Sequence, residues 1–434
     1  MAKITLIGAG SVVFTKTLLG DILQFPELGD SEIALMDINA DRLKIAEILA
    51  HKLADALKVK PKITAYTDRK AALKGADYVI NTIQVGGYEP STVIDFEIPK
   101  KYGLKQTIAD TLGIGGIMRG LRTIPVMVAM CRQMEKLCPD AWLLNYTNPM
   151  AINTGAVLQQ TGVKAVGLCH GIQGSHGWLS QCLGLPQDEV SFVAAGTNHC
   201  AWFMKLEHKG KDLYPRLKKL VAKGADFVKN DPVRFEMMRR FGYYGGESSE
   251  HTAEYFPYFI RKGQEELIER FNVPIDEYIT RCISQNEKWD EMAKGFMDKN
   301  EPIGDIHRST EYGSGIIHSI ETGTPRVVYG NILNNNHITN LPNRACVEVP
   351  CLVDHNGIQG TVVGDMPEQC AALVRTNLNV HMLTQKASVT LKRDDVYQAA
   401  FLDPLTATNL SMDEIVSLVD DLIEAHGEYL PKFS

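Results

Sequence analysis

A strand–turn–helix pattern at the start of the chain restricts the fold most. The apolar run Ile4–Ile7 ends at two turn glycines, Gly8 and Gly10, and residues 12–24 then have the character of a helix. A second apolar run, Ile33–Met36, follows. Glycines at such a turn let a dinucleotide pyrophosphate approach the backbone, and the helix N-terminus stabilises its charge. The pattern predicts the first βαβ unit of a dinucleotide-binding fold.

Residues near this turn indicate which dinucleotide binds. Asp37 ends the second apolar run, where a carboxylate accepts hydrogen bonds from both ribose hydroxyls of NAD and repels the 2′-phosphate of NADP. Arg42 leaves NADP open as an alternative. Ser11 stands at the helix entry and is assigned with the two glycines to cofactor binding, whereas Val13 replaces the third glycine of the usual fingerprint. We expect an NAD site, and the alternative is a turn with a structural role only.

Strand and helix signals alternate up to about residue 170, which is typical of a parallel sheet with crossover helices. We therefore expect an α/β fold of the Rossmann type, doubly wound and similar to lactate and malate dehydrogenases. The regularity fades beyond about residue 190, with no internal repeat and no low-complexity linker. The predicted organisation is an NAD-binding domain over residues 1–190 and an interlocked α+β domain over residues 191–434, assigned to substrate and metal binding and to oligomerisation.

Composition excludes several classes of protein. With 44% hydrophobic and 22% charged residues, a net charge of −7 and no basic stripe, the chain is unlike a disordered or nucleic-acid-binding protein. No continuous apolar stretch reaches the roughly 18 residues that span a bilayer, and we recognise no cleavable leader. The nine cysteines include no CxxC pair, which favours reduced thiols. We expect a cytoplasmic protein without nucleic-acid or membrane partners.

Two further segments place chemical groups after predicted strands. Asn148 and Pro149 follow the strand 141–146, at the sheet edge where doubly wound folds bind ligands, in a layout that resembles malate dehydrogenase. The alternative is a helix N-cap at Asn148. Cys169 follows the next strand, and with His199 it forms a thiolate–imidazole pair that could hold a divalent cation and leave positions free for substrate oxygens. The alternative for Cys169 is a small buried hydrophobic residue.

Several longer motifs carry a resemblance to a known family. They are Gly86–Pro90, Gln106–Gly113, Gly115–Ile117, Leu121–Pro125, Leu144–Met150, Gly167–His170, Glu247–His251 and Ala425–Gly427. These segments are similar to the melibiase-type α-galactosidases of glycoside hydrolase family 4, and they are spread over nearly the whole chain. The resemblance implies an NAD- and manganese-dependent glycosidase, an exception to hydrolysis by two carboxylates. It also implies a homodimer or homotetramer.

The resemblance assigns roles to individual residues. Cys169 and His199 become the metal ligands, Asn148 contacts the sugar, and the turn glycines with Asp37 hold NAD. The implied reaction oxidises the sugar transiently at C3 and removes the proton from C2. The glycosidic oxygen then leaves from C1 by β-elimination, water adds back, and the hydride returns, so that the net redox change is zero.

The resemblance leaves the acid and the base less defined. Asp110 lies where relatives place their acid, with a helix-capping carboxylate as the alternative. His170 is a rival proton donor, or else a histidine that only orients the site. For the base at C2, some relatives use a tyrosine and others an aspartate, within the segment corresponding to residues 247–255. This segment contains four candidates, of which we select the first and the last: Glu250, His251, Glu254 and Tyr255.

Other functions remain open from the sequence. An α-glucosidase, an α-galacturonidase or a 6-phospho-glycosidase would share the same machinery. A malate or lactate dehydrogenase would produce NADH with turnover, although the catalytic His-Gly-Asp/Glu segment of those enzymes is not found in a matching place. A regulator that binds NAD without chemistry would have no need of the metal pair. We expect hydrolysis of an unphosphorylated α-galactoside such as melibiose.

Overall fold

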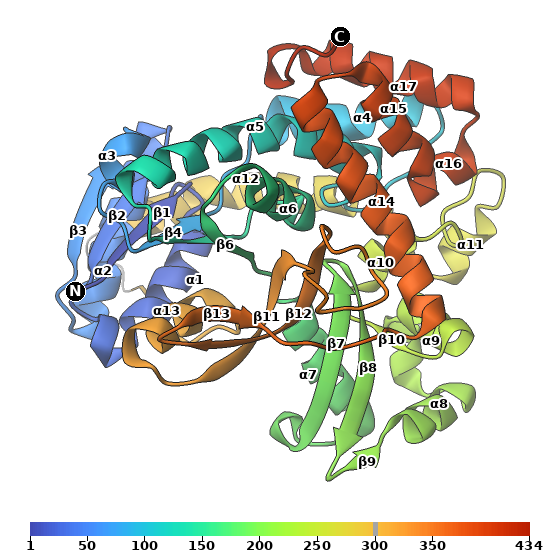
Figure 1. Ribbon diagram of the computed structural model, residues 1–434, viewed down its shortest axis with the longest axis horizontal. Coiled ribbons are helices and arrows are strands. Elements are labelled where there is room, and N and C mark those ends of the chain that lie inside the picture. Colours follow the sequence, from blue (N-terminus) through green and yellow to red (C-terminus); the bar gives the residue numbers. More distant parts are fainter. Residues whose placement is uncertain (298–302) are drawn as a thin grey trace.

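The computed structural model describes residues 1–297 and 303–434. Its centre is a sheet of thirteen strands, with a main path in the order β10-β8-β7-β12-β11-β6-β5-β4-β1-β2-β3. The two halves of the chain contribute the two halves of this sheet (Figure 1).

The parallel half has the strand order of a doubly wound dinucleotide-binding fold. Its strands are β1 (Lys3–Ile7), β2 (Glu32–Met36), β3 (Lys62–Tyr66), β4 (Tyr78–Asn81), β5 (Trp142–Asn145) and β6 (Lys164–Gly167). The order reverses between β1 and β4, which is the place where ligands bind in such sheets. The predicted Rossmann-type fold is therefore confirmed.

Successive side chains of β1 point to opposite faces of the sheet, and apolar residues of β1 lie on both, so helices cover both faces of this half. Ile4 and Leu6 belong to the main core, together with Leu18 of α1 (Val12–Leu23), whereas Ile7 belongs to a second core with Met130 of α5 (Gly113–Leu137). Each face therefore buries its own layer of apolar side chains. The other helices of this half are α2 (Ala40–Leu57), α3 (Arg69–Leu73), α4 (Val93–Lys101), α6 (Met150–Gln160) and α7 (Gly171–Leu183).

The second half extends the same sheet with antiparallel strands. They are β7 (Val190–Thr197), β8 (Cys200–His208), β9 (Lys211–Asp212), β10 (Tyr244–Gly245), β11 (Arg326–Leu333), β12 (Cys346–Asp354) and β13 (Gly357–Gly360). β11 joins β6 through the pair Asn331 and Gly167, and β12 joins β7 through Glu348 and Gly196. The predicted interlocking of the two halves is confirmed, because one sheet runs through both.

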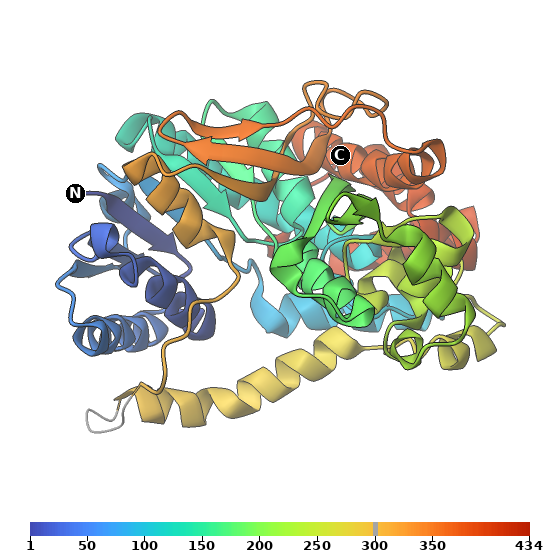
Figure 2. The ribbon, with the colours of Figure 1, turned by 90° about the horizontal axis from the view of Figure 1, so that it is seen from below.

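Helices of the second half complete the fold. They are α8 (Tyr214–Ala222), α9 (Pro232–Phe241), α10 (Ser249–Tyr255), α11 (Glu266–Arg270), α12 (Glu277–Met297), α13 (Tyr312–Thr322), α14 (Glu368–Thr390), α15 (Arg393–Leu402), α16 (Pro404–Asn409) and α17 (Met412–His426). Figure 2 shows α12 running along the lower edge of the molecule toward α2. The guanidinium carbon of Arg42 in α2 lies 4.5 Å from the centre of the Trp289 ring in α12.

Helix α5 includes the glycine-rich segment Gly113–Gly116 at its start. This segment forms the first turn of the helix, because α5 begins at Gly113. A Cβ at Gly115 would lie 2.5 Å from the carbonyl oxygen of Ala109, so this position has room for glycine alone. α5 is long and apolar enough to cross a membrane, with a mean hydropathy of 1.3, but 78% of that segment is buried within the fold. Because most of this segment is buried, α5 is a helix of the protein core.

Candidate functional site

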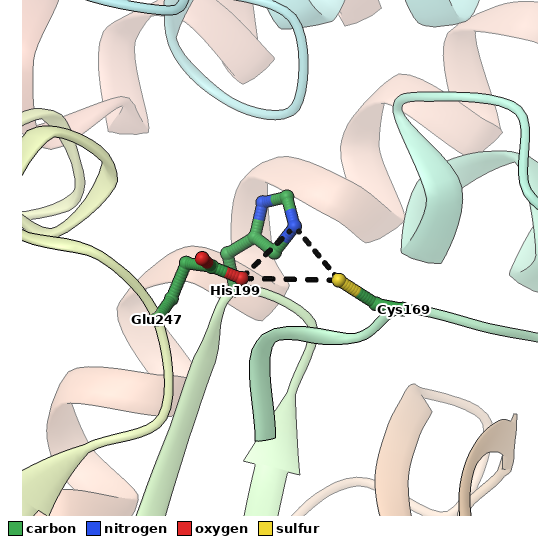
Figure 3. Close-up of side chains that lie close together, drawn as sticks. All are labelled: Cys169, His199 and Glu247. Atoms are coloured by element: carbon green, nitrogen blue, oxygen red, sulfur yellow. Dashed lines mark hydrogen bonds and ion pairs between the residues drawn. The ribbon is translucent and has the colours of Figure 1, made fainter. Parts of the chain in front are cut away.

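Three possible metal ligands reach one point from separate elements. Cys169 follows β6, His199 lies in the turn between β7 and β8, and Glu247 follows β10. Because β10 pairs with β8 and β7 lies beside β12, the sheet brings these distant segments together at one edge. Figure 3 shows the three side chains pointing toward one another.

The distances within this cluster suit one bound ion. His199 Nε2 lies 3.4 Å from Cys169 Sγ and 3.3 Å from Glu247 Oε2, and the sulfur and the carboxylate oxygen are 3.8 Å apart. Thiolate, imidazole and carboxylate are all ligands for divalent transition metals, and three protein donors leave coordination positions open for substrate. Sequence reasoning selected two of the three residues. It missed Glu247 as a ligand, although Glu247 opens one of the motifs that carry the family resemblance.

The surroundings of the cluster favour ligation. Burial lowers the pKa of His199 to about 4, so its imidazole is neutral at neutral pH and can offer a lone pair. Burial, with the charge of Glu247, raises the pKa of the Cys169 thiol well above its ordinary value. A cation must therefore displace a proton from Cys169 in order to bind.

Tyr255 and Thr111 fix the orientation of His199. The Tyr255 hydroxyl donates to Thr111 Oγ1 over 2.7 Å, and the same oxygen lies 3.2 Å from His199 Nδ1. Since Nε2 faces the other two ligands, the arrangement places the ring proton on Nδ1, where Thr111 accepts it. The Thr111 hydroxyl alone therefore separates Tyr255 from His199.

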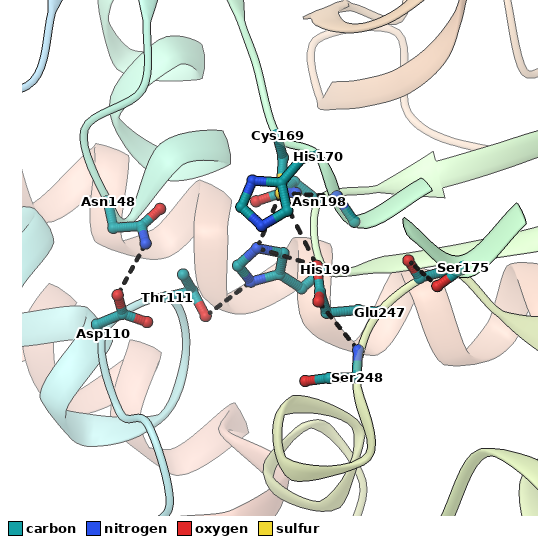
Figure 4. A network of polar contacts seen from close by, with 12 residues as sticks. Asp110, Thr111, Asn148, Cys169, His170, Ser175, Asn198, His199, Glu247 and Ser248 are labelled. Carbon is teal, nitrogen blue, oxygen red and sulfur yellow. Dashed lines mark hydrogen bonds and ion pairs between the residues drawn. The ribbon is translucent and has the colours of Figure 1, made fainter. Parts of the chain in front are cut away.

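Asp110 and Asn148 form a second polar group beside the cluster (Figure 4). The Asn148 amide donates to Asp110 Oδ2 over 2.7 Å. Asp110 Oδ1 is buried and has no hydrogen-bond partner among the described residues. Both helix-capping alternatives are wrong, because Pro149 is the N-cap of α6, Leu112 is the N-cap of α5, and neither helix has a side-chain capping bond.

Glu254 anchors the segment that carries Asp110. Its Oε1 accepts hydrogen bonds from the backbone N–H groups of Thr107, Ile108 and Ala109. Burial raises the pKa of Glu254 to about 7, although the three backbone donors favour its charged form. Sequence reasoning named Glu254 only as one candidate base, because nothing local indicates a contact between residues so far apart in the chain.

Among the other predicted acid–base residues, the His251 ring lies 4.3 Å from the His199 ring, whereas His170 and Glu250 each pair with a charged side chain outside the cluster. His170 Nδ1 is 3.1 Å from a Glu311 carboxylate oxygen, and the His170 side chain is 67% exposed. The Glu250 carboxylate pairs with Arg281 at 2.9 Å on a more exposed surface. The structure thus brings Tyr255 close to the ligand cluster and leaves Glu250 outside it.

The turn after β1 has the geometry expected of the predicted dinucleotide site. Gly10 N–H donates to Asp37 Oδ2 over 2.7 Å, and a Cβ at Gly10 would lie 2.6 Å from that oxygen. Gly8 lies against the backbone of Thr82 after β4, so the turn sits at the point where the strand order reverses. Ser11 is exposed at the N-cap of α1 and makes no side-chain capping bond there. Helix N–H groups there remain available to an anion such as a pyrophosphate.

Comparison with known sequences places the chain in a family. Residues 3–185 match the model of the family 4 glycosyl hydrolases, and residues 194–406 match the model of the C-terminal domain of the same family. The chain belongs to glycosyl hydrolase family 4. The predicted family resemblance is therefore confirmed.

Individual relatives agree with membership of family 4. An α-galactosidase of Bacillus subtilis is 50% identical over 433 residues, which cover 100% of both chains. A 6-phospho-α-glucosidase from gut microorganisms, solved with NAD and Mn²⁺, superposes with a TM-score of 0.83 over 100% of both chains at 20% identity. A lactate dehydrogenase of Cryptosporidium parvum superposes with a TM-score of 0.54 at 12% identity, over 89% of this chain and 98% of the other. The last two show the fold alone.

Proposed function

We propose that this family 4 enzyme hydrolyses α-galactosides and uses NAD and Mn²⁺. One observation carries the proposal: Cys169, His199 and Glu247 converge beside the Asp110–Asn148 pair, at the carboxyl edge of a dinucleotide-binding sheet. The α-galactosidase that is 50% identical over its full length supports the choice of substrate. The donor set of sulfur, nitrogen and oxygen supports the metal.

Each cofactor has residues suited to it. Cys169, His199 and Glu247 would hold Mn²⁺, whereas the turn at Gly8, Gly10 and Ser11, together with Asp37, would hold NAD. When bound, NAD supplies a reversible hydride acceptor for the sugar, and Mn²⁺ supplies a Lewis acid for the sugar hydroxyl oxygens.

Asp110 acts as the acid in this proposal. Its Oδ2 accepts from Asn148, so a proton on this carboxyl is carried by the unpartnered Oδ1, from which it can pass to the glycosidic oxygen. Glu254 accepts hydrogen bonds from the backbone just before Asp110 and so fixes the position of that segment. Asn148 has a second role in contacting the sugar. His170, exposed and paired with Glu311, remains the rival donor.

Tyr255 is our proposed base at C2, in preference to Glu250. Burial raises the pKa of Tyr255 well above its ordinary value, so its hydroxyl loses a proton only when positive charge lies nearby. The neighbouring ligand cluster is suited to hold a cation. The Glu250 carboxylate is already neutralised by Arg281, and its backbone carbonyl accepts from the Thr107 hydroxyl, so it supports the Asp110 segment from outside.

The wider organisation follows from the same proposal. Residues 1–190 form the NAD-binding domain and also carry Cys169, Asp110 and Asn148 of the metal and substrate site. Residues 191–434 contribute the rest of that site, with His199 and Glu247, and the oligomer interface. The separate matches over residues 3–185 and 194–406 support this division. We further propose a cytoplasmic homo-oligomer, a homodimer or a homotetramer, which acts on small α-glycosides.

A panel of nitrophenyl α- and β-glycosides tests the proposal. We expect α-galactoside hydrolysis that requires NAD, Mn²⁺ and a thiol reductant, with no accumulation of NADH. Product formed in D₂O should carry deuterium at C2, because the base exchanges its proton with solvent. Unlabelled product would exclude the redox route, whereas accumulating NADH would indicate a dehydrogenase. Preference for an α-glucoside, an α-galacturonide or a 6-phospho-glycoside would change the proposed substrate and leave the proposed mechanism as it is.

A further inference from the structure

A buried polar cluster lies behind the three proposed metal ligands. We call it the Asp231 cluster, and it consists of Ser175, Trp178, Asp231, Arg234, Tyr244 and Ser249. Asp231 is 2% exposed, Arg234 is 8% exposed and Ser175 is 4% exposed. Groups of this kind are costly to bury unless they are fully bonded to one another, so their arrangement has one favoured geometry.

The Asp231 carboxylate is the centre of this cluster. Oδ1 accepts from Arg234 Nε over 2.8 Å and from the Ser249 hydroxyl over 2.6 Å. Oδ2 accepts from Trp178 Nε1 over 3.2 Å and from the Tyr244 hydroxyl. One carboxylate therefore joins α7, α9, the strand β10 and the start of α10.

Arg234 and Ser175 continue the network toward Glu247. Arg234 Nη1 donates to Ser175 Oγ over 2.7 Å, and the guanidinium lies 4.7 Å from the centre of the Tyr244 ring. Ser175 Oγ then donates to the carbonyl oxygen of Gly246 over 3.1 Å. Since Gly246 N–H also donates to the Ala201 carbonyl over 2.8 Å, the residue before Glu247 is held at both its polar groups.

The network holds both ligand-bearing segments at once. Ser175 and Trp178 belong to α7, which begins two residues after Cys169. Gly246 and Ser249 flank Glu247 on its own segment, and both are bonded to members of the cluster. The cluster thus joins the segment that carries Cys169 to the segment that carries Glu247.

We propose that the Asp231 cluster positions Glu247 against Cys169 and so determines how tightly the metal binds. The proposal rests on the metal site in the proposed function. Its members do not contact the ion or the substrate, so they are positioning residues. Removing one link should leave the fold intact, and it should release Glu247 from the 3.8 Å separation between its Oε2 and Cys169 Sγ.

Two serines of α7 make a matched pair for the test. The Ser175 hydroxyl bonds Gly246 in the Glu247 segment, whereas the Ser180 hydroxyl bonds the His176 carbonyl within the same helix, over 2.9 Å. Both are buried, and both lose one hydroxyl on substitution by alanine. Ser175→Ala and Ser180→Ala therefore differ in the link to Glu247, and Ser175→Ala also removes the acceptor of Arg234 Nη1 within the Asp231 cluster.

The measurement is titration of the metal-free full-length enzyme with Mn²⁺ by calorimetry, together with its melting temperature. We expect Ser175→Ala to weaken Mn²⁺ binding about tenfold and Ser180→Ala to leave it within about twofold of wild type. Ser175→Ala should melt at a lower temperature than Ser180→Ala, because it also leaves a buried guanidinium N–H of Arg234 without its acceptor. Activity of Ser175→Ala should recover at high Mn²⁺, because the catalytic groups are unchanged.

Other results distinguish failure of the positioning role from failure of the proposed metal site. Equal Mn²⁺ affinity in both variants would overturn the positioning role, even if both were destabilised. Wild-type enzyme that binds no Mn²⁺ would overturn the proposed metal site itself, and this inference with it. If Ser175→Ala does not fold, Ser249→Ala tests the other side of Glu247. Unchanged Mn²⁺ affinity in Ser249→Ala would then overturn the proposal.

Discussion

The Asn148 side-chain amide donates a hydrogen bond of 2.7 Å to Oδ2 of Asp110. These two residues lie 38 positions apart in the chain, one before α5 and the other before α6. The bond uses one carboxylate oxygen as an acceptor and leaves the other buried without a partner among the described residues. In the proposed function, this bond orients Asp110 as the proton donor, and the residue that makes it, Asn148, is the one proposed to contact the sugar.

Asp110→Asn should separate acid catalysis from the other steps. An acid matters most when the leaving group is a poor one, so we expect kcat/KM on melibiose to fall by about a hundredfold or more. The loss on nitrophenyl α-galactoside should be much smaller, and deuterium exchange at C2 should survive. Equal losses on both substrates, with exchange abolished, would assign Asp110 to another role and make His170 the preferred donor.

Cys169→Ser should remove the metal without unfolding the protein. A hydroxyl replaces a thiolate ligand, so we expect loss of Mn²⁺ binding and of nearly all activity, and the same for His199→Ala. Cys138→Ser is the control, because Cys138 is a buried free cysteine outside the ligand cluster. Wild-type enzyme should lose activity in air and recover with reductant. Full activity of the Cys169 variant with Mn²⁺ below stoichiometry would contradict the ligand assignment.

Metal binding should release a proton. Because burial and Glu247 raise the pKa of Cys169, the metal-free thiol is protonated at neutral pH, and the incoming cation displaces that proton. Calorimetry of Mn²⁺ binding in buffers with different ionisation enthalpies should report about one proton released per ion. The affinity should rise with pH over the same range. No proton release would mean that the thiol is not a ligand.

Asp37 and Trp289 should together determine the preference for NAD over NADP. Asp37→Ala removes the repulsion of a 2′-phosphate. The Kd for NADP divided by the Kd for NAD should therefore fall about tenfold, which corresponds to about 1.4 kcal/mol. The Arg42 guanidinium is stacked on Trp289. Adding Trp289→Ala should free Arg42 and improve NADP binding further. A wild type that binds both dinucleotides equally would refute the ribose role of Asp37.

Asp403 should make stability depend on pH in the acidic range. Its carboxyl is buried at the N-cap of α16, and burial raises the pKa of Asp403 to about 6. The folded state then holds a proton that the unfolded state releases from about pH 4, so stability falls as pH rises toward 6, by at most about 3 kcal/mol. Asp403→Asn keeps a good cap and cannot ionise. Urea unfolding should therefore show that the free energy of unfolding of wild type falls relative to that of this variant between pH 4 and 6. If the two free energies change with pH in parallel, Asp403 is not a buried neutral acid.

The sequence could predict the features that depend on short-range order. The βαβ start at Gly8 and Gly10, the strand-end position of Asp37 and the parallel half of the sheet all follow from apolar periodicity and turn residues within a few tens of positions. Long motifs shared with family 4 added Asp110, and the family resemblance assigned the Cys169–His199 pair to a metal. These motifs identify residues, but they do not say which of them meet.

Tertiary structure alone decided the composition of the site. Glu247 joins Cys169 and His199 because β10 pairs with β8, and Glu254 reaches the backbone at Thr107 across a separation of 147 residues. The same packing directs Glu250 to Arg281 and away from the ligand cluster. Neighbouring residues on a short helix such as α10 point in different directions, and the element packed on each side determines what each one contacts. Sequence spacing does not reveal those partners, so the convergence of Cys169, His199 and Glu247 and the Asn148–Asp110 hydrogen bond arise only when the sheet is assembled.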